Sequence, residues 1–144
     1  MVKRKSERFK VLQKLAGKYE ELAAQSLGQS VSNVDAQKAR LAELKLFREE
    51  YTQQFYASGA EGISGAAIQS YQNFIAQLDV AIEQQKQTLF AAEADQSTKK
   101  EIWQDKHQTT RIYDKTIEKY STKELKERER LEQKEQDDRT QTLK

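Results

Sequence analysis

The sequence contains no proline and no cysteine, and only five of its 144 residues are glycine. Proline inside a helix costs about 3 kcal/mol and glycine about 1 kcal/mol, so a chain nearly free of both favours long uninterrupted helices. Without cysteine the chain has no disulfide framework, no thiolate nucleophile and no cysteine metal ligand. The lack of cysteine agrees with a reducing compartment.

Long apolar runs are also missing. No segment approaches the roughly 20 apolar residues that span a bilayer, and no apolar stretch follows the basic residues 1–5 as it would in a secretory signal. Hydrophobic residues make up 36% of the chain and charged residues 33%, with a mean hydropathy of -0.97. This is too little apolar material for a broad core, so we expect the core to be a thin seam between helices. From the missing membrane span and signal we expect a soluble cytoplasmic protein.

Catalytic constellations are absent from the sequence as well. His107 is the only histidine, and no second histidine or cysteine accompanies it as a zinc site would need. The glycines at 59, 62 and 65 lack the Gly-Lys-Ser/Thr that completes a phosphate-binding loop. We therefore expect no catalytic residue, no cofactor and no metal, and a protein that is not an enzyme.

The sequence is rich in apolar residues at alternating spacings of three and four, most clearly in its second half. Such a heptad pattern, sustained over more than four repeats, predicts a coiled-coil helix. Its polar members, Gln85, Gln96, Lys99, Lys106 and Thr110, weaken packing but specify register. Its apolar members are Ile68, Tyr71, Ile75, Leu78, Ile82, Leu89, Ala92, Trp103, Tyr113, Ile117 and Tyr120.

The first half predicts a less regular helix. An apolar stripe runs through Leu12, Leu15, Tyr19 and Leu22, and the apolar residues then move to a different phase at Leu27, Val31 and Val34. Such a shift is typical of a stutter, so we expect a loosened segment there. The seam resumes at Leu41, Leu44, Tyr51 and Phe55, with Arg48 in a core-like position and its head reaching outward.

Three glycines within seven residues mark a turn between the two patterns, and Ser64 suits the N-cap of the second helix. Folding the chain near residue 61 sets Tyr51 opposite Tyr71, Tyr19 opposite Trp103 and Phe9 opposite Tyr113. We predict an all-α fold, a long antiparallel two-helix coiled-coil hairpin forming a single domain over residues 1–144. Its parts are a helix over about 3–57, a turn over about 58–64 and a helix over about 65–140. Residues 121–144 overhang the first helix, and we expect this unpaired end to fray.

Phe47 and Phe74 lie beside the predicted seam, at nearly the same level of the hairpin. A two-helix coiled coil has one buried face, so these rings are expected to be exposed near the turn, where aromatic patches commonly mark a protein partner. The alternative is that they simply broaden an ordinary seam.

The residues around the turn form a specific pattern: Tyr51, the turn Gly62-Ile63-Ser64, and then Tyr71-Gln72, Phe74-Ile75, Leu78 and 81–84. This pattern resembles that of the flagellar export protein FliJ family. The length, the hairpin layout and the basic N-terminal helix are similar over essentially the whole chain. The resemblance implies a fold like the central-stalk gamma subunit of rotary ATPases.

The resemblance also implies a function in the flagellar type III protein export apparatus. Family members insert their helical termini into the hexameric export ATPase ring, promote its assembly, contact the cytoplasmic domain of the membrane export gate and act as chaperones or chaperone escorts. The resemblance further implies a location in the cytoplasm, peripheral to the inner membrane at the base of the flagellum.

Particular residues follow from the resemblance by position. Arg40 and Gln85 depart from it, since the family can have glutamine and histidine there. The implied gate-binding residues are Leu44, Phe47, Tyr51, Phe74, Leu78 and Ala81. The implied ring-binding residues are Phe9, Leu12, Tyr113, Ile117, Tyr120, Lys123, Arg128 and Arg130.

Two other functions remain open from the sequence. One is the equivalent stalk of a virulence-type secretion system. The other is a nucleic-acid or ribosome-associated coiled coil, suggested by the basic N-terminal helix and a pI near 8.7. The net charge is only +2, so we expect no nucleic-acid partner. The basic amphipathic start could also contact an acidic protein or an anionic membrane surface.

Overall fold

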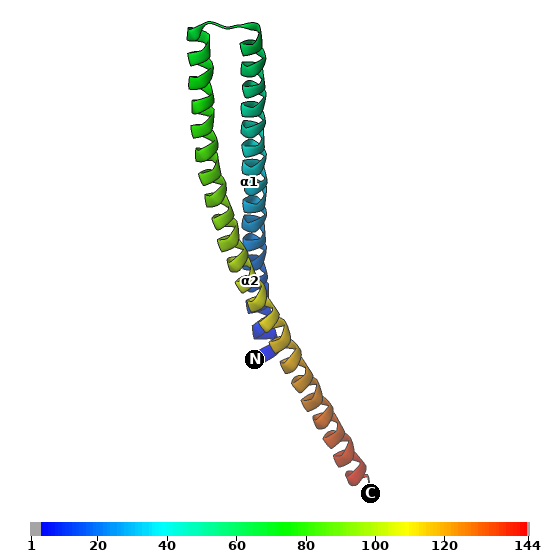
Figure 1. Cartoon of the computed structure of the whole chain (residues 1–144). Helices are drawn as coiled ribbons and strands as arrows, with labels where there is room; N and C mark the ends of the chain where they lie inside the picture. The colour runs from blue at the N-terminus through cyan, green and yellow to red at the C-terminus, as the bar shows by residue number, and fades with distance from the viewer. Residues whose placement is uncertain (1–3, 144) are drawn as a thin grey trace. The chain divides into compact units, whose positions relative to one another are not determined.

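The computed structural model describes residues 4–143, which form two helices joined by a short turn (Figure 1). Helix α1 is Lys5–Glu61 and helix α2 is Gly65–Thr142. The predicted all-α hairpin fold is confirmed; the expected start of the first helix, residue 3, lies outside the described residues. Contacts group the chain into two compact units, Gln25–Glu101 and a terminal unit of the residues up to Ala24 with those from Ile102 onward. A single domain stays a prediction.

The turn depends on one residue with a left-handed backbone. Gly62 has φ 91°, a conformation that costs little only for glycine, and its N–H donates to the Gly59 carbonyl at 3.2 Å. Ser64 caps α2 as predicted, since its Oγ accepts from the Ala67 N–H at 3.1 Å. Helix α1 continues past its expected end at residue 57 and ends at Glu61, so the turn between the helices is only residues 62–64.

In the hairpin unit, Gln25–Glu101, apolar side chains from both helices form the expected seam. Val34 of α1 and Leu78, Ile82 and Ala92 of α2 are all buried. The predicted pairing of Tyr51 with Tyr71 is confirmed by ring centroids 5.1 Å apart. The predicted frame of α2 is therefore correct in this unit.

A polar contact interrupts the apolar seam of the hairpin unit. Gln85 is buried, and its Nε2 donates to the backbone carbonyl of Gln37 at 3.1 Å and to the Gln37 Oε1 at 2.8 Å. Because an amide buried without partners is costly, these bonds favour the one register in which Gln85 meets Gln37.

In the terminal unit, aromatic rings hold the two helices together near the start of α1. The Phe9 ring lies 6.3 Å from Tyr113, as predicted, and stacks on Tyr120 at 5.5 Å. Ala16 and Ile117 are buried in the same seam. The seam therefore continues along α2 in the predicted frame.

The predicted frame of the first helix is wrong in the terminal unit. Leu12, Leu15, Tyr19 and Leu22 were expected in the seam, yet Leu22 is 60% exposed and its neighbour Ala23 only 9%. The seam lies one residue later along the helix. From Phe9 to Val34 its members keep spacings of three and four, so the expected stutter is also wrong. They are Phe9, Gln13, Ala16, Glu20, Ala23, Leu27, Ser30 and Val34.

The bulk of the α2 side chains explains the shift of frame. Trp103 occupies the α2 side of the terminal seam, and the small residue Ala23 on α1 allows the helices to approach there. The pairing of Glu20 with His107 sets Ala23 at about the level of Trp103, where Tyr19 was expected.

Helix α2 continues past Glu124, which is hydrogen-bonded to Ser6 near the start of α1, and residues 125–143 are all exposed (Figure 1). This stretch, the α2 extension, contains an ion pair between Glu127 and Arg130 at 2.8 Å. Fraying of the extension in solution stays a prediction. Within residues 4–143, neither helix is sufficiently long and apolar to cross a membrane.

Candidate functional site

An aromatic cluster from both helices lies near the turn of the hairpin unit. The Tyr51 ring lies 4.4 Å from Phe74, and the Phe47 ring lies 6.4 Å from Tyr51 and 6.1 Å from Phe74. Tyr71 packs between Tyr51 and Phe55, with centroids at 5.1 and 5.3 Å. These five residues, the tip cluster, bring together the aromatic residues that spacing had placed at one level.

The six residues carried over as gate-binding differ in what they offer to a partner. Phe47 is 49% exposed, although its ring packs on two others. Leu78 is buried in the seam. The remaining four are half-buried: Leu44, Tyr51, Phe74 and Ala81. The structure thus brings all six to one part of the hairpin unit, with Phe47 as the most accessible.

A groove of about 430 Å³ adjoins the tip cluster, and we call it the tip groove. Leu44 and Ala81 were predicted here, and Arg40 and Gln85 had been noted as departures from the family. Sequence reasoning missed the other three, although Thr88 follows Phe74 and Ala81 at spacings of seven and so shares their side of α2. The lining residues are Gln37, Arg40, Leu44, Ala81, Gln84, Gln85 and Thr88.

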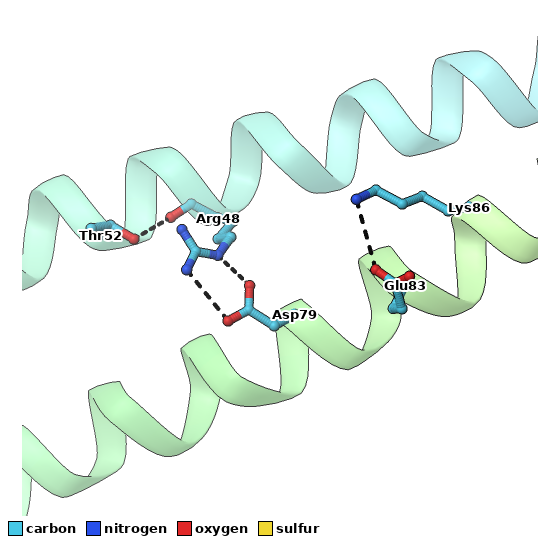
Figure 2. Close-up of polar contacts among 5 residues, drawn as sticks. All are labelled: Arg48, Thr52, Asp79, Glu83 and Lys86. Carbon is cyan, nitrogen blue, oxygen red and sulfur yellow. Dashed lines mark hydrogen bonds and ion pairs between the residues drawn. The ribbon is translucent and has the colours of Figure 1, made fainter.

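The other flank of the hairpin unit is charged. Figure 2 shows the guanidinium of Arg48 on α1 directed at the carboxylate of Asp79 on α2, with both oxygens engaged. Their hydrogen bond raises the pKa of Arg48 and lowers that of Asp79. The predicted outward reach of Arg48 is therefore confirmed. Since the pair is solvent-exposed, it contributes more to pairing specificity than to stability.

The residues carried over as ring-binding divide into packed and exposed sets. Phe9 packs against both Tyr113 and Tyr120, and Ile117 is buried. The structure brings these four together as part of the seam. The exposed set consists of Leu12, Lys123, Arg128 and Arg130.

Glu124 of α2 closes the terminal unit at the start of α1. Its carboxylate accepts from the Ser6 hydroxyl at 2.6 Å and from the Ser6 N–H at 3.3 Å. The hydroxyl bond is the main reason that the pKa of Glu124 is lowered, with Arg4 and Lys10 adding attraction. A carboxylate at a helix N-terminus also meets the positive end of the helix dipole. This closure was not visible in the apolar pattern.

The single histidine also joins the helices of the terminal unit. His107 Nδ1 lies 2.6 Å from Glu20 Oε1, and the imidazole stacks on Trp103 with centroids 5.1 Å apart. The pKa of Glu20 is lowered, chiefly by the hydrogen bond with His107 and then by one from Thr110. No group of three or more side chains suited to a metal ion occurs in the part of the chain that the structure describes.

Comparison with known proteins gives one family match. The family model described as Flagellar FliJ protein matches residues 5–143. No curated protein and no solved structure matches the chain.

Proposed function

Because the chain belongs to the FliJ family and is thus a component of the flagellar type III export apparatus, we propose that it is the stalk linking the export ATPase ring to the export gate. In this proposal the tip cluster and tip groove bind the cytoplasmic domain of the gate protein. The terminal unit and the α2 extension insert into the hexameric ATPase and promote its assembly.

The observation that carries the gate contact is the half-exposed Phe47 ring. A large aromatic side chain that is packed on two neighbouring rings is already ordered, so it loses little conformational entropy when a partner buries it. The adjoining tip groove supplies polar groups from Gln37 and Gln84 for hydrogen bonds at the rim of such a contact.

Binding of the gate's cytoplasmic domain to the Phe47→Ala variant tests this contact. Loss of a central aromatic anchor should weaken binding about tenfold or more. Phe90→Ala is the matched control, because Phe90 is also an exposed aromatic residue of the hairpin unit, 74% exposed, but is not part of the tip cluster. Unchanged affinity of Phe47→Ala, with helicity intact by circular dichroism, would exclude the tip cluster as the gate site.

The ring contact is supported by the exposed charge of the terminal unit. Lys123, Arg128 and Arg130 are exposed and lie at or beyond the level of the start of α1. A helix that carries exposed charges of both signs and few apolar residues is suited to a polar channel whose acidic groups can pair with its cations. The packed residues Phe9, Tyr113, Ile117 and Tyr120 would then keep its base rigid.

Stimulation of the purified export ATPase tests the ring contact. The double charge reversal Lys123→Glu with Arg128→Glu should lower the stimulation several-fold, since it replaces two attractions by two repulsions. The control reverses two exposed lysines of the hairpin unit, Lys38→Glu with Lys45→Glu. Equal stimulation by both double variants would remove the α2 extension from the ring contact.

The proposal also includes export chaperones as partners, and a position in the cytoplasm, peripheral to the inner membrane at the base of the flagellum. Family membership is its support. Co-purification of the tagged chain with the ATPase and with unloaded export chaperones, and its recovery with membranes only when the gate protein is present, is the expected outcome.

A further inference from the structure

One flank of the terminal unit is formed by residues that recur at intervals of seven, which in a coiled coil lie along one line of a helix. On α1 the line contains Lys5, Leu12 and Tyr19. Leu15 follows Leu12 by three residues and Leu22 follows Tyr19 by three, so both lie beside this line. The line of α2 that faces them contains Ile102, Thr109, Thr116 and Lys123. We call this side of the unit the terminal flank.

Large apolar side chains are left uncovered on this flank. Leu12 is 42% exposed, Leu15 49% and Tyr19 53%, although each has a small or polar neighbour occupying the seam. Between the two helices they line a groove of about 160 Å³, the terminal groove. Its lining residues are Leu12, Leu15, Ala16, Tyr19, Lys106, Thr109 and Tyr113. Four consecutive large residues at helical spacing form a stripe that is unusual for a surface.

Lysine predominates around the terminal groove. Lys106 lines the groove, and Lys5 and Lys123 lie farther along the same flank, while Asp105 is one turn before Thr109 on α2. Lys106 places its Nζ 5.9 Å from the Tyr19 ring, and Lys5 and Lys123 lie 5.5 and 5.9 Å from the Tyr120 ring. The two lines that define the flank contain no Asp or Glu. The opposite flank is mixed, because Glu7, Lys14 and Glu21 share one line of α1 there and Asp114 lies on α2.

From these observations we infer that the terminal groove binds an acidic amphipathic α-helix of a partner protein. A third helix would place apolar side chains at spacings of three and four between Leu15 and Thr109, as helices do when they bind a groove. Its carboxylates would then meet Lys5, Lys106 and Lys123 along the edges. The inference goes beyond the ring and gate contacts at Leu15, Tyr19 and Leu22, which belong to neither set. It shares Leu12, Tyr113 and Lys123 with the residues carried over as ring-binding.

Charge and shape favour this occupant over two others. A second copy of the chain meeting the first through this flank would bring lysine against lysine, which opposes association. An anionic membrane would attract the lysines, but a groove recessed between two helices accepts protruding side chains better than a lipid surface. The acidic helix satisfies both the charge and the concave shape.

A designed peptide can test the inference on the full-length protein. The probe is a helical peptide of about three heptads with leucine at the a and d positions and glutamate at e and g, and a second peptide carries lysine in place of glutamate. Binding is measured by the fluorescence of Trp103, the single tryptophan, which lies next to Ile102 of the flank. The acidic peptide should bind and the basic peptide should not.

Variants then locate the binding. Leu15→Glu with Tyr19→Glu should weaken the acidic peptide at least about tenfold, because it replaces apolar contacts by repulsion. Leu125→Glu is the matched control, since Leu125 is 50% exposed on α2 and outside the flank. Lys106→Gln should reduce the salt dependence of binding.

Three outcomes would overturn the inference. The first is equal binding of the acidic and the basic peptide. The second is undiminished binding of the acidic peptide by the flank variant. The third is a protein that binds no peptide but uses the flank either to dimerise or to bind phosphatidylglycerol vesicles. The ring and gate assays are separate measurements. A flank variant that loses the peptide but still stimulates the ATPase and binds the gate would support the inference alone, whatever becomes of the stalk proposal.

Discussion

The carboxylate of Glu124 caps a helix to which it does not belong: it accepts both the N–H and the hydroxyl hydrogen bonds of Ser6 in the first turn of α1. The N–H groups of a first turn have no partner within their own helix. A residue of α2 therefore satisfies donors of α1 and holds the start of that helix in place.

Ser6→Ala should lower the free energy of unfolding by about 1 kcal/mol, because Ser6 is buried and loses its hydroxyl hydrogen bond. Urea unfolding followed by circular dichroism measures the change. Ser97→Ala, at an exposed position of α2, should be neutral by comparison. Equal effects of the two substitutions would mean that the closure contributes nothing.

Acidification should destabilise the terminal unit. The pKa values of Glu20 and Glu124 are lowered from an ordinary 4.5, each mainly by a hydrogen bond from the other helix. Because the folded pKa lies below the unfolded one, the stabilisation is present above the unfolded value and is lost as pH falls through the folded value.

Melting temperatures measured from about pH 6 down to about pH 3 test this dependence. Glu20→Gln with Glu124→Gln should melt lower near pH 6 and show a flatter pH profile. Glu43→Gln with Glu93→Gln, at two exposed positions, is the control. A profile as steep in the first pair as in the unsubstituted protein would locate the acid sensitivity elsewhere.

Adjacent substitutions in α1 test the corrected seam. Ala16→Gln should cost about 1 to 3 kcal/mol, because a longer polar side chain is forced between the helices. Leu15→Gln should change stability by less than about 0.5 kcal/mol, although leucine is the larger apolar residue, because Leu15 is half exposed. Urea unfolding of the two variants in parallel measures both effects. If the predicted stripe were the seam, Leu15→Gln would be the more destabilising of the two.

The buried amide of the hairpin unit should trade stability for specificity. Gln85→Leu should raise the free energy of unfolding by about 1 kcal/mol through apolar burial, while Gln37, only half-buried, turns to water. Sedimentation of the same variant should show a mixture of oligomeric states in place of a single one, because the register of the two helices is less restricted. Gln77→Leu, exposed on α2, should leave both properties unchanged. A destabilised, homogeneous Gln85→Leu protein would contradict the register role.

Glycines of the turn should respond in opposite directions. Gly62→Ala should destabilise by about 1 kcal/mol, because φ at 91° is unfavourable for a residue with a side chain. Gly59→Ala should stabilise by up to about 1 kcal/mol, since Gly59 is helical and an added Cβ would have no atom within 4 Å. Thermal melts of both variants measure the difference, and the same sign for both would show that the turn tolerates a side chain at residue 62.

Periodicity predicted the frame of α2 because many of its seam positions, such as Leu78, Ile82 and Ile117, carry large apolar residues. On α1 the two properties separate: Ala16 and Ala23 lie in the seam while Leu15 and Leu22 do not. The apolar pattern of one helix does not show that bulky partners such as Trp103 require small residues opposite. Contacts such as Glu20 with His107 also depend on the register of the pair, which the single-helix pattern leaves open.

The chain reversal at Gly62 also has a kinetic consequence. Ser58 and Tyr71, beside the turn, are 13 residues apart, whereas Ser6 and Glu124 are separated by 118. Contacts between near neighbours close at a smaller entropic cost, so we expect folding to begin at the turn and to proceed toward the chain ends. Where the two helices are paired, native-state amide exchange should accordingly be slower near Leu78 than near Phe9. The segments that meet last while the protein forms would be the first to separate when a partner pulls on them.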